Sequence, residues 1–231
     1  MKKAVFCWSG GKDSALALYR IQQAREYEVC ALLTTMSGAF QRISMHGIGE
    51  GLLDMQAAAI GLPLTKVTVD EATNAAYEGA MLRELSTYKE RGIHYVIYGD
   101  IHLDDLRRYR EQMLDHIGME AVFPLWSEDT ATLVKEFIRA GFKTITCCVN
   151  EALLDCSFAG KIIDDAFVDH LPAGVDPCGE NGEYHTFCYD GPLFHYSIPL
   201  TVEGMVQRKI NYGADEYDFC YADLRLTEMV S

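Results

Sequence analysis

Short apolar runs alternate with longer amphipathic stretches through the first half of the chain. The apolar runs are three to seven residues long and often end in glycine or a polar residue, as buried strands do. In the stretches between them, apolar residues recur every three or four positions, which is typical of helices. The expected strands are 4–8, 29–35, 64–69, 93–98 and 121–123, and the expected helices are 13–23, 50–60, 73–91 and 104–117. This alternation predicts a parallel sheet with helices on both faces.

The second half of the chain has a different pattern. The elements expected there are a helix over 130–140, a strand over 143–149, a helix over 160–171 and, from 172 onward, loops and β-structure. Tyr217, Phe219 and Tyr221 alternate with polar residues, as in a half-buried strand. We therefore expect two domains, 1–126 and 127–231, of which the second is a smaller α+β domain.

The six residues that follow the first expected strand, Ser9-Gly10-Gly11-Lys12-Asp13-Ser14, have the composition of a phosphate-binding turn. Two adjacent glycines allow a tight turn and a close approach of the backbone to a ligand. The helix that follows directs N–H groups and the positive end of its dipole at an anion. Serine hydroxyls and a lysine add donors and charge, and the aspartate is suited to capping the helix or to holding Mg²⁺. The alternative is a capped glycine turn that binds nothing.

The same six residues resemble the PP-loop pattern SGGxDS of the ATP pyrophosphatases and lack the longer gap of the Walker loop. The resemblance implies a five-stranded, HUP-like (Rossmann-like) parallel sheet and cleavage of ATP into AMP and pyrophosphate. Ligands of such sheets bind at the carboxyl ends of the strands. We therefore expect the loop 36–49 and Gly99-Asp100 at the same edge of the sheet as the PP-loop.

Charge narrows the choice of partners. The formal net charge is −14, from 20 Lys and Arg against 34 Asp and Glu, so nucleic acid is an unfavourable partner. Arg107, Arg108 and Arg110 cluster, but either a local basic patch or a solvated helix face accounts for them. No apolar run is long enough to cross a bilayer and no signal peptide precedes the first strand, so neither a membrane nor secretion is expected.

The cysteines agree with a cytoplasmic protein. In a reducing compartment we expect all eight to be free thiols. None forms a CxxC pair, which disfavours a structural zinc site. Cys147 and Cys148 lie in an apolar stretch, where burial in a strand is the expected role.

A second unusual segment, 176–187, gathers three carboxylates, an amide, an imidazole and two hydroxyls around two glycines. Its composition alone favours a surface turn that leads into a hairpin, since Asn-Gly is a common hairpin signal. Its sequence, however, resembles the signature GEGGEYET of the diphthine–ammonia ligase family, the PP-loop ATPases that amidate diphthine to diphthamide. The resemblance spans essentially the whole chain, through the PP-loop, Ser44-Met45-His46-Gly47, Gly99-Asp100-Ile101 and Pro124-Leu125-Trp126.

This chain departs from that signature at two positions. Asn181 stands where a glycine is usual, and His185 stands where an acidic residue is usual. The resulting GENGEYHTF resembles a bacterial subgroup of the family. Because an exchange of acid for histidine alters both charge and proton transfer, the resemblance implies the fold and the ATP chemistry but not diphthine as the substrate.

The resemblance also implies a reaction and a set of residues. A substrate carboxylate attacks the α-phosphorus of ATP, pyrophosphate leaves, and ammonia then displaces AMP to form an amide. The expected catalytic residues are Asp13, His46, Asp100, Glu183 and His185, of which either of the last two moves the ammonia proton. The residues expected to bind nucleotide are Ser9, Gly10, Gly11, Lys12, Asp13, Ser14, Thr34, His46 and Gly99, with Asp13 also the expected Mg²⁺ ligand. Those expected to bind substrate are Glu180, Asn181, Glu183, Tyr184, His185 and Thr186.

The expected partners are ATP, ammonia and a carboxylate carried by a small molecule or by a modified protein side chain, and a homo-oligomer stays open. Two other functions also stay open. One is a PP-loop enzyme that thiolates tRNA with sulfur carried by Cys147 or Cys156, which the acidic balance and the lack of CxxC pairs disfavour. The other is a regulator that binds ATP without turning it over. The intact Ser9–Ser14 loop favours turnover.

Overall fold

The computed structural model describes residues 1–37, 42–43, 47–69, 73–212 and 215–227. The chain forms two compact units, which we call the N-terminal and the C-terminal unit. The N-terminal unit comprises Met1–Ser9, Asp13–Ser44 and Gly61–Glu128, and the C-terminal unit comprises Gly10–Lys12, Met45–Ile60 and Asp129–Ser231. The middle of the PP-loop therefore groups with the C-terminal unit. The expected boundary between residues 126 and 127 stays a prediction.

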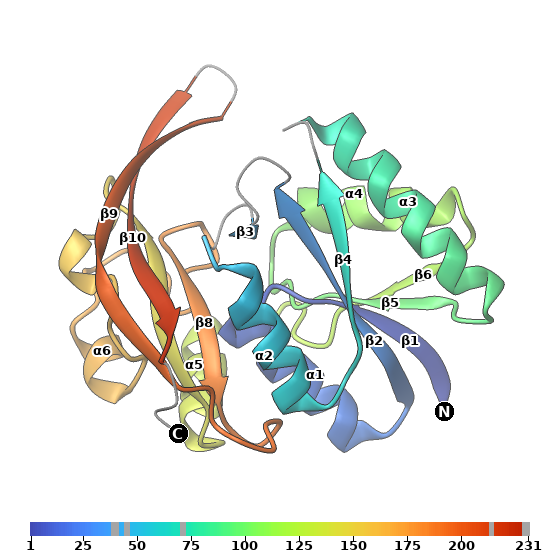
Figure 1. Ribbon diagram of the computed structural model, residues 1–231, viewed down its shortest axis with the longest axis horizontal. Helices are drawn as coiled ribbons and strands as arrows, with labels where there is room; N and C mark the ends of the chain where they lie inside the picture. Colours follow the sequence, from blue (N-terminus) through green and yellow to red (C-terminus); the bar gives the residue numbers. More distant parts are fainter. Residues whose placement is uncertain (38–41, 44–46, 70–72, 213–214, 228–231) are drawn as a thin grey trace. The chain divides into compact units, whose positions relative to one another are not determined.

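The N-terminal unit is built on a six-stranded sheet in the order β3-β2-β1-β5-β6, with β4 also paired to β2 (Figure 1). Its strands are β1 (Lys2–Cys7), β2 (Tyr27–Ser37), β3 (Arg42–Ile43), β4 (Leu64–Val69), β5 (Tyr95–Ile97) and β6 (Glu120–Val122). All pairs are parallel except the short antiparallel pairing of β3 with β2. The five parallel strands confirm the expected Rossmann-like fold class.

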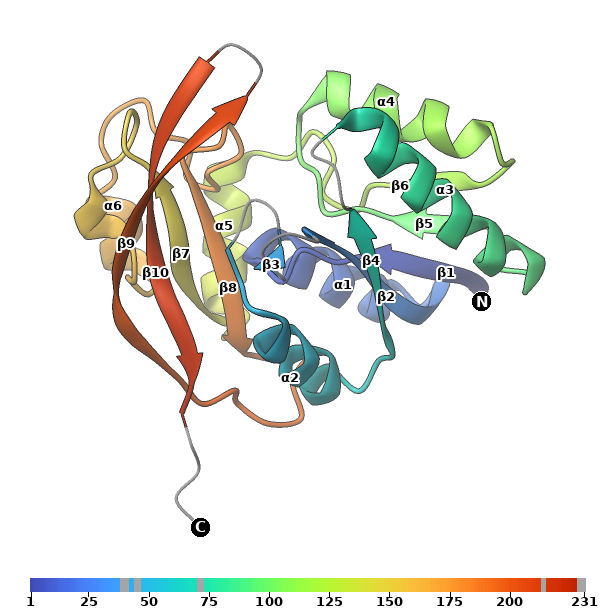
Figure 2. The same ribbon diagram turned by 45° about the horizontal axis from the view of Figure 1, so that its top comes forward.

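Helices of the N-terminal unit are α1 (Lys12–Ala24), α3 (Asn74–Glu90) and α4 (Asp104–Asp115). Side chains of α3 and α4 pack with Val5, Leu33 and Val96 in one hydrophobic core, and the two helices lie side by side in Figures 1 and 2. Phe6 and Leu32 are fully buried as well. Because successive residues of a strand point to opposite faces, both faces of the sheet are covered, as predicted.

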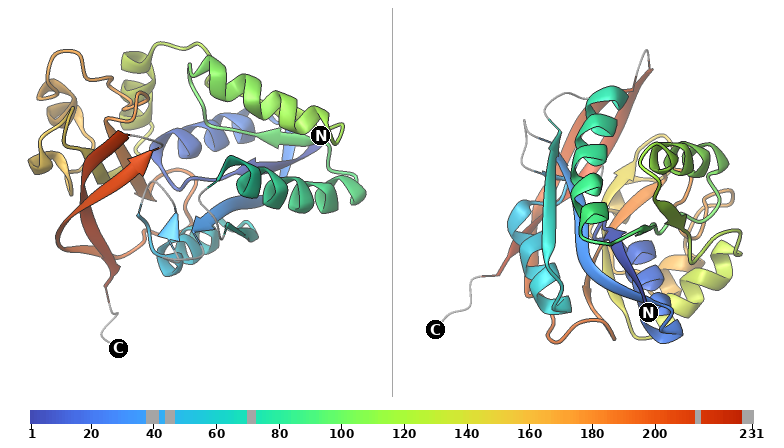
Figure 3. Two further views of the ribbon diagram at one scale, coloured as in Figure 1. Left: turned by 90° about the horizontal axis from the view of Figure 1, so that it is seen from above. Right: turned by 90° about the vertical axis from the view of Figure 1, so that its right-hand side faces the viewer.

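The C-terminal unit contains a four-stranded sheet in the order β8-β7-β10-β9, in which all pairs are antiparallel. Its elements are α2 (Glu50–Ile60), α5 (Thr130–Arg139), β7 (Lys143–Asn150), the 3-10 turn η1 (Cys156–Phe158), α6 (Asp165–Asp169), β8 (Tyr184–Asp190), β9 (Leu200–Tyr212) and β10 (Asp215–Leu226). Figure 3 shows the long, twisted strands β9 and β10 from two directions. The sheet and its helices confirm the expected α+β class. No helix in the described part of the chain is long and apolar enough to cross a membrane.

The prediction of a helix over 160–171 is wrong for the first part of this segment. The backbone of Gly160–Ile163 instead extends along β7, with hydrogen bonds from Thr146 N to Lys161 O at 2.8 Å and from Ile163 N to Thr144 O at 3.0 Å. Helix α6 begins only after Asp164, whose carboxylate accepts from Phe167 N at 2.8 Å. Pairing with β7 therefore outweighs the helical periodicity of this segment.

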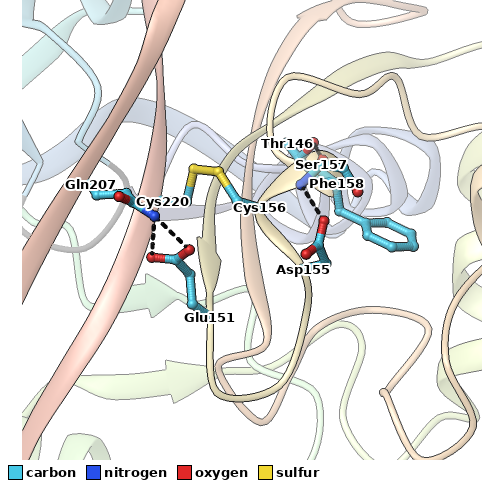
Figure 4. The surroundings of a disulfide bond; sticks show 8 residues. All are labelled: Thr146, Glu151, Asp155, Cys156, Ser157, Phe158, Gln207 and Cys220. Carbon is cyan, nitrogen blue, oxygen red and sulfur yellow. Dashed lines mark hydrogen bonds between the residues drawn. A yellow bond between two sulfur atoms is a disulfide. The ribbon is translucent and has the colours of Figure 1, made fainter.

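The expectation of eight free thiols is wrong for two cysteines. Cys156 in η1 and Cys220 in β10 form a disulfide across 64 residues of sequence (Figure 4). Six cysteines are free, and Cys147 and Cys148 are buried in β7 as expected. The antiparallel pairing of β10 with β7 brings the two cysteines together. Because this contact joins residues that are distant in sequence, the sequence alone does not indicate the disulfide.

Candidate functional site

Ser9 and Ser14 close the PP-loop from its two ends. The backbone N–H of Ser9 donates to Ser14 Oγ at 3.3 Å, and the two hydroxyl oxygens are 2.8 Å apart. Gly99, just beyond β5, lies against the same turn, since a Cβ at Gly99 would lie 3.0 Å from Ser14 N and 3.1 Å from Asp13 C. Only a residue without a side chain fits at that distance without displacing the backbone of α1. The predicted proximity of Gly99 to the PP-loop is thus present within the N-terminal unit.

Asp100 follows Gly99 and forms an ion pair with Arg110 of α4. Arg110 Nε lies 2.7 Å from Asp100 Oδ2, and Arg110 Nη2 donates to Asp100 Oδ1 at 3.2 Å. The guanidinium also lies 4.2 Å from the centre of the Tyr98 ring. Burial raises the pKa of Asp100, the charge of Arg110 opposes that rise, and the nearby Asp13 carboxylate adds to it. The charge on the Asp13 carboxylate thus affects that of Asp100, which is paired with Arg110.

Sequence reasoning missed the role of Arg110, which it placed with its neighbours in a basic patch or on a solvated helix face. Arg107 does pair with Glu111 at 2.7 Å, and Arg108 pairs with the exposed Asp105. Arg110 is different, because it reaches Asp100 at the carboxyl end of β5. A weak signal was present in the sequence. Asp105 lies three residues before Arg108 and Glu111 lies four residues after Arg107, so these two arginines have carboxylate partners on their own helix.

Lys12 in the middle of the PP-loop is buried, with 2% of its surface exposed. Its backbone N–H donates to Thr186 Oγ1 at 3.0 Å, and its ammonium group donates to the carbonyl of Cys178. The ammonium also lies 5.4 Å from the centre of the Tyr184 ring. Within the C-terminal unit these contacts join the PP-loop to the segment 176–187. Contact between Lys12 and phosphate stays a prediction.

The carboxylate of Glu183 holds the segment 176–187 together. It is 3% exposed. Its Oε1 accepts from Asp176 N at 2.9 Å and from Asn181 Nδ2 at 3.1 Å, and its Oε2 accepts from Asn181 N at 3.0 Å. These hydrogen bonds give Glu183 a structural part in the loop, and its proposed part in proton transfer stays a prediction. Glu180 is half-buried and Asn181 is exposed.

Tyr184, His185 and Thr186 begin β8. Tyr184 is 2% exposed, and its hydroxyl donates to Pro177 O at 2.5 Å. Burial and the Lys12 ammonium lower the pKa of His185 to about 4. The imidazole is therefore neutral at pH 7 and a weak base, which limits the proton transfer that it performs there.

The remaining candidates are placed as follows. Thr34 is buried in β2, with 2% of its surface exposed. His46, with Ser44 and Met45 before it, lies outside the described residues. Sequence reasoning also missed Gln56 of α2, whose amide Nε2 donates to Gly10 O at 2.9 Å. The sequence did contain an indication of this contact, because Gln56 is a single glutamine among apolar residues of its helix.

Comparison with known proteins gives matches over most of the chain. The model described as the diphthamide synthase N-terminal domain matches residues 1–121, and the model described as the diphthamide synthase C-terminal domain matches residues 129–215. The chain is 27% identical to the diphthine–ammonia ligases of Bos taurus and Homo sapiens, over 96% of this chain and 92% of each relative. It is 28% identical to the diphthine–ammonia ligase of Danio rerio, over 82% of this chain and 83% of that one.

Among solved structures, the chain is similar to a U34-tRNA thiolase from Methanococcus maripaludis with its [4Fe-4S] cluster. The identity is 16%, the TM-score is 0.35, and the match covers 60% of this chain and 56% of the thiolase. A likeness this low does not bear on the function.

Proposed function

This chain belongs to the diphthamide synthase family, and we propose that it is an ATP-dependent ligase that joins ammonia to a substrate carboxylate as an amide. The observation that carries the proposal is that both domain models of the family match this one chain, the first across the intact Ser9–Ser14 loop and the second across GENGEYHTF. The names of the curated relatives, diphthine–ammonia ligases, support the reaction class.

The proposed reaction has two steps. A carboxylate oxygen of the substrate attacks the α-phosphorus of ATP, the bond from that phosphorus to the bridging oxygen breaks, and pyrophosphate leaves. Ammonia then attacks the carbonyl carbon, AMP leaves, and the nitrogen loses a proton, so that an amide, AMP and pyrophosphate are the products. The enzyme contributes mainly by aligning the groups and by stabilising negative charge on the phosphates.

We assign the pyrophosphate end of ATP to the PP-loop and the first turn of α1. The hydroxyl oxygens of Ser9 and Ser14 are 2.8 Å apart and share one hydrogen bond. Each hydroxyl has a single proton, so both would donate to one phosphate group when the ligand replaces that hydrogen bond. The helix N-terminus adds backbone N–H groups and a partial positive charge. Each donor directed at developing charge contributes on the order of 2–4 kcal/mol to the stability of the transition state.

Asp13 and Asp100 are the proposed ligands of Mg²⁺. Their carboxylates are close enough to affect each other's charge, and Mg²⁺ is commonly held by one or two carboxylates together with phosphates of the substrate. The cation, when bound, would neutralise charge on the phosphates. Arg110, whose Nε lies 2.7 Å from Asp100 Oδ2, favours the ionised form of that carboxyl and opposes the rise that burial causes in its pKa.

The substrate side is assigned to Glu180, Asn181, Glu183, Tyr184, His185 and Thr186. The proposal names a carboxylate rather than diphthine because this chain carries Asn181 and His185 where the family signature has a glycine and an acid. A neutral imidazole in place of an acid favours a substrate group of different charge at that position.

The test is a product assay. The protein is incubated with ATP, Mg²⁺, ammonium and a panel of carboxylic acids, and AMP, ADP and pyrophosphate are separated and counted. We expect AMP and pyrophosphate in equal amounts, with a rate that one acid raises. ADP as the product would contradict the proposal, and ATP that binds without cleavage would indicate a regulator.

The substitution Asp13→Ala is expected to lower pyrophosphate release by about 100-fold or more and to leave the melting temperature within a few degrees of the wild-type value. Asp115→Ala, at an exposed position of α4, is the matched control and should keep full activity. Full activity of Asp13→Ala would exclude the role assigned to that carboxylate.

A further inference from the structure

Gln56 is a polar residue in an apolar position. Helix α2 buries Leu52, Leu53, Ala57, Ala59 and Ile60 together with Gln56, which has no exposed surface. Burying a side-chain amide costs several kcal/mol, on the order of 2–7, unless its hydrogen bonds are replaced. A glutamine at this position is therefore favourable only if the fold provides partners for it.

Two of its partners are backbone carbonyls that are far apart in sequence. Gln56 Nε2 donates to Gly10 O at 2.9 Å and to Cys188 O at 2.6 Å. The backbone N–H of Cys188 also donates to Gly10 O, at 2.9 Å. All three residues lie in the C-terminal unit. The Gly10 carbonyl thus accepts two hydrogen bonds, and both come from groups outside the PP-loop.

These hydrogen bonds determine the direction of one peptide group of the PP-loop. The chain has no cis peptide bonds among the described residues, and in a trans peptide the C=O and N–H point in opposite directions. Because the Gly10 carbonyl is held toward β8 and Gln56, the N–H of Gly11 is turned to the opposite side. Gly10 has φ of +82°, a backbone conformation that residues with a Cβ rarely adopt, so glycine is favoured at this position.

We propose that Gln56 is a positioning residue of the PP-loop, which holds the Gly10–Gly11 peptide in the orientation that binds the pyrophosphate end of ATP. The inference rests on the proposed function in that the PP-loop must bind phosphate. It adds a residue from a helix 46 positions further along the chain, outside every motif of the sequence. The competing explanation is that Gln56 only attaches α2 to β8.

The test compares binding of ATP and of inorganic pyrophosphate by calorimetry in the full chain. Gln56→Met keeps the length of the side chain and removes both hydrogen bonds, and we expect it to weaken both ligands by about 10- to 100-fold, as the loss of one to two hydrogen bonds implies. Asp54→Asn, at an exposed position of the same helix, is the control and should stay within about two-fold of the wild type. If Gln56→Met lowers only the melting temperature and both affinities stay within two-fold, the positioning role is excluded.

A second variant keeps the inference testable if Gln56→Met does not fold. In Gln56→Glu a protonated carboxyl can donate one hydrogen bond to Gly10 O, whereas an ionised one cannot. We expect the affinity of Gln56→Glu for pyrophosphate, relative to the wild type at each pH, to be several-fold higher at pH 6 than at pH 8. A ratio that does not change with pH would count against the inference.

Failure of the inference and failure of the proposed function give different results. If the wild type binds ATP but releases no pyrophosphate, the ligase proposal fails and the affinities of the Gln56 variants still decide the positioning role. If the wild type binds neither ATP nor pyrophosphate, the PP-loop is not a phosphate site and both are overturned.

Discussion

His185 combines an unusual position with an unusual charge state. It lies at the start of β8, next to the buried Lys12 ammonium, and its pKa is lowered to about 4 by burial and by that cation. A second positive charge beside Lys12 is unfavourable, so the fold selects the neutral imidazole. The same residue type in water would be partly charged at pH 6.5.

We expect the free energy of unfolding to fall as the pH drops from about 6.5 toward 4. The pKa of His185 in the folded state is below its value in the unfolded chain, so the unfolded state binds more protons in this window and acid favours it. The contribution of this residue amounts to at most about 3 kcal/mol at the acid end. Urea unfolding of the wild type and of His185→Gln across this range is the measurement, and the variant should depend less on pH. Equal pH dependence of the two proteins would contradict the pKa shift.

Residue type alone does not predict the partners of three side chains in and around the PP-loop, Lys12, Gln56 and Arg110. The sequence predicts that a lysine in a glycine turn carries positive charge near a ligand, but it does not show that the ammonium group contacts the Cys178 carbonyl. Nor does it show which carboxylate pairs with Arg110 among the many acidic residues of the chain. Long, flexible side chains such as these can reach many partners, and the fold selects among them.

Among the larger elements, α3 and the segment 160–171 illustrate success and failure of local prediction. The start of α3 carries its own signal, because Thr73 Oγ1 accepts from Ala76 N at 3.2 Å as an N-cap. The segment 160–171 has a comparable helical periodicity, but residues 160–163 pair with β7. Local propensity amounts to tenths of a kcal/mol per residue, so backbone pairing with a buried strand outweighs it.

The segment 176–187 offers a test with two glycines of similar conformation. Gly179 has φ of +68° and Gly182 has φ of +85°, but a Cβ at Gly179 would lie 2.8 Å from Tyr184 O, whereas nothing lies within 4 Å of a Cβ at Gly182. Gly182→Ala is expected to cost about 1 kcal/mol through backbone conformation alone. Gly179→Ala should cost 1–3 kcal/mol more, on the order of an overpacking penalty. Chemical denaturation of both variants checks this, and equal losses would show that the contact with Tyr184 relaxes without cost.

In the whole molecule, the chain passes from one compact unit to the other within the PP-loop itself. Ser9 and Asp13 group with the N-terminal unit, and the three residues between them group with the C-terminal unit, where they contact β8 and the segment 176–187. Two of the segments that carry the family resemblance, the PP-loop and the segment 176–187, are therefore in direct contact through Lys12 and Thr186, which are 174 residues apart.

The disulfide gives a prediction for the stability of the C-terminal unit. Closing a loop of 64 residues between Cys156 and Cys220 lowers the entropy of the unfolded chain and stabilises the oxidised protein by about 4 kcal/mol. Urea unfolding with and without a reductant should show this difference, and Cys220→Ser should abolish it. Cys30→Ser, which removes a free thiol, is the matched control and should retain it. Eight reactive thiols in the denatured, unreduced protein would contradict the disulfide, because six are expected.

The amino-acid sequence was sufficient for the parallel sheet, the order of its helices, the PP-loop and the family, because each depends on local periodicity or on residues adjacent along the chain. Prediction from sequence failed for the disulfide, for the extended residues 160–163 and for the partners of Lys12, Gln56 and Arg110. Each of these depends on groups that the sheets bring together, such as Gly10 and Cys188. Such residues are far apart in sequence, so the chain between them does not determine the distance between them in space. Burial then makes the pairing obligatory, since a polar group removed from water must find a partner within reach.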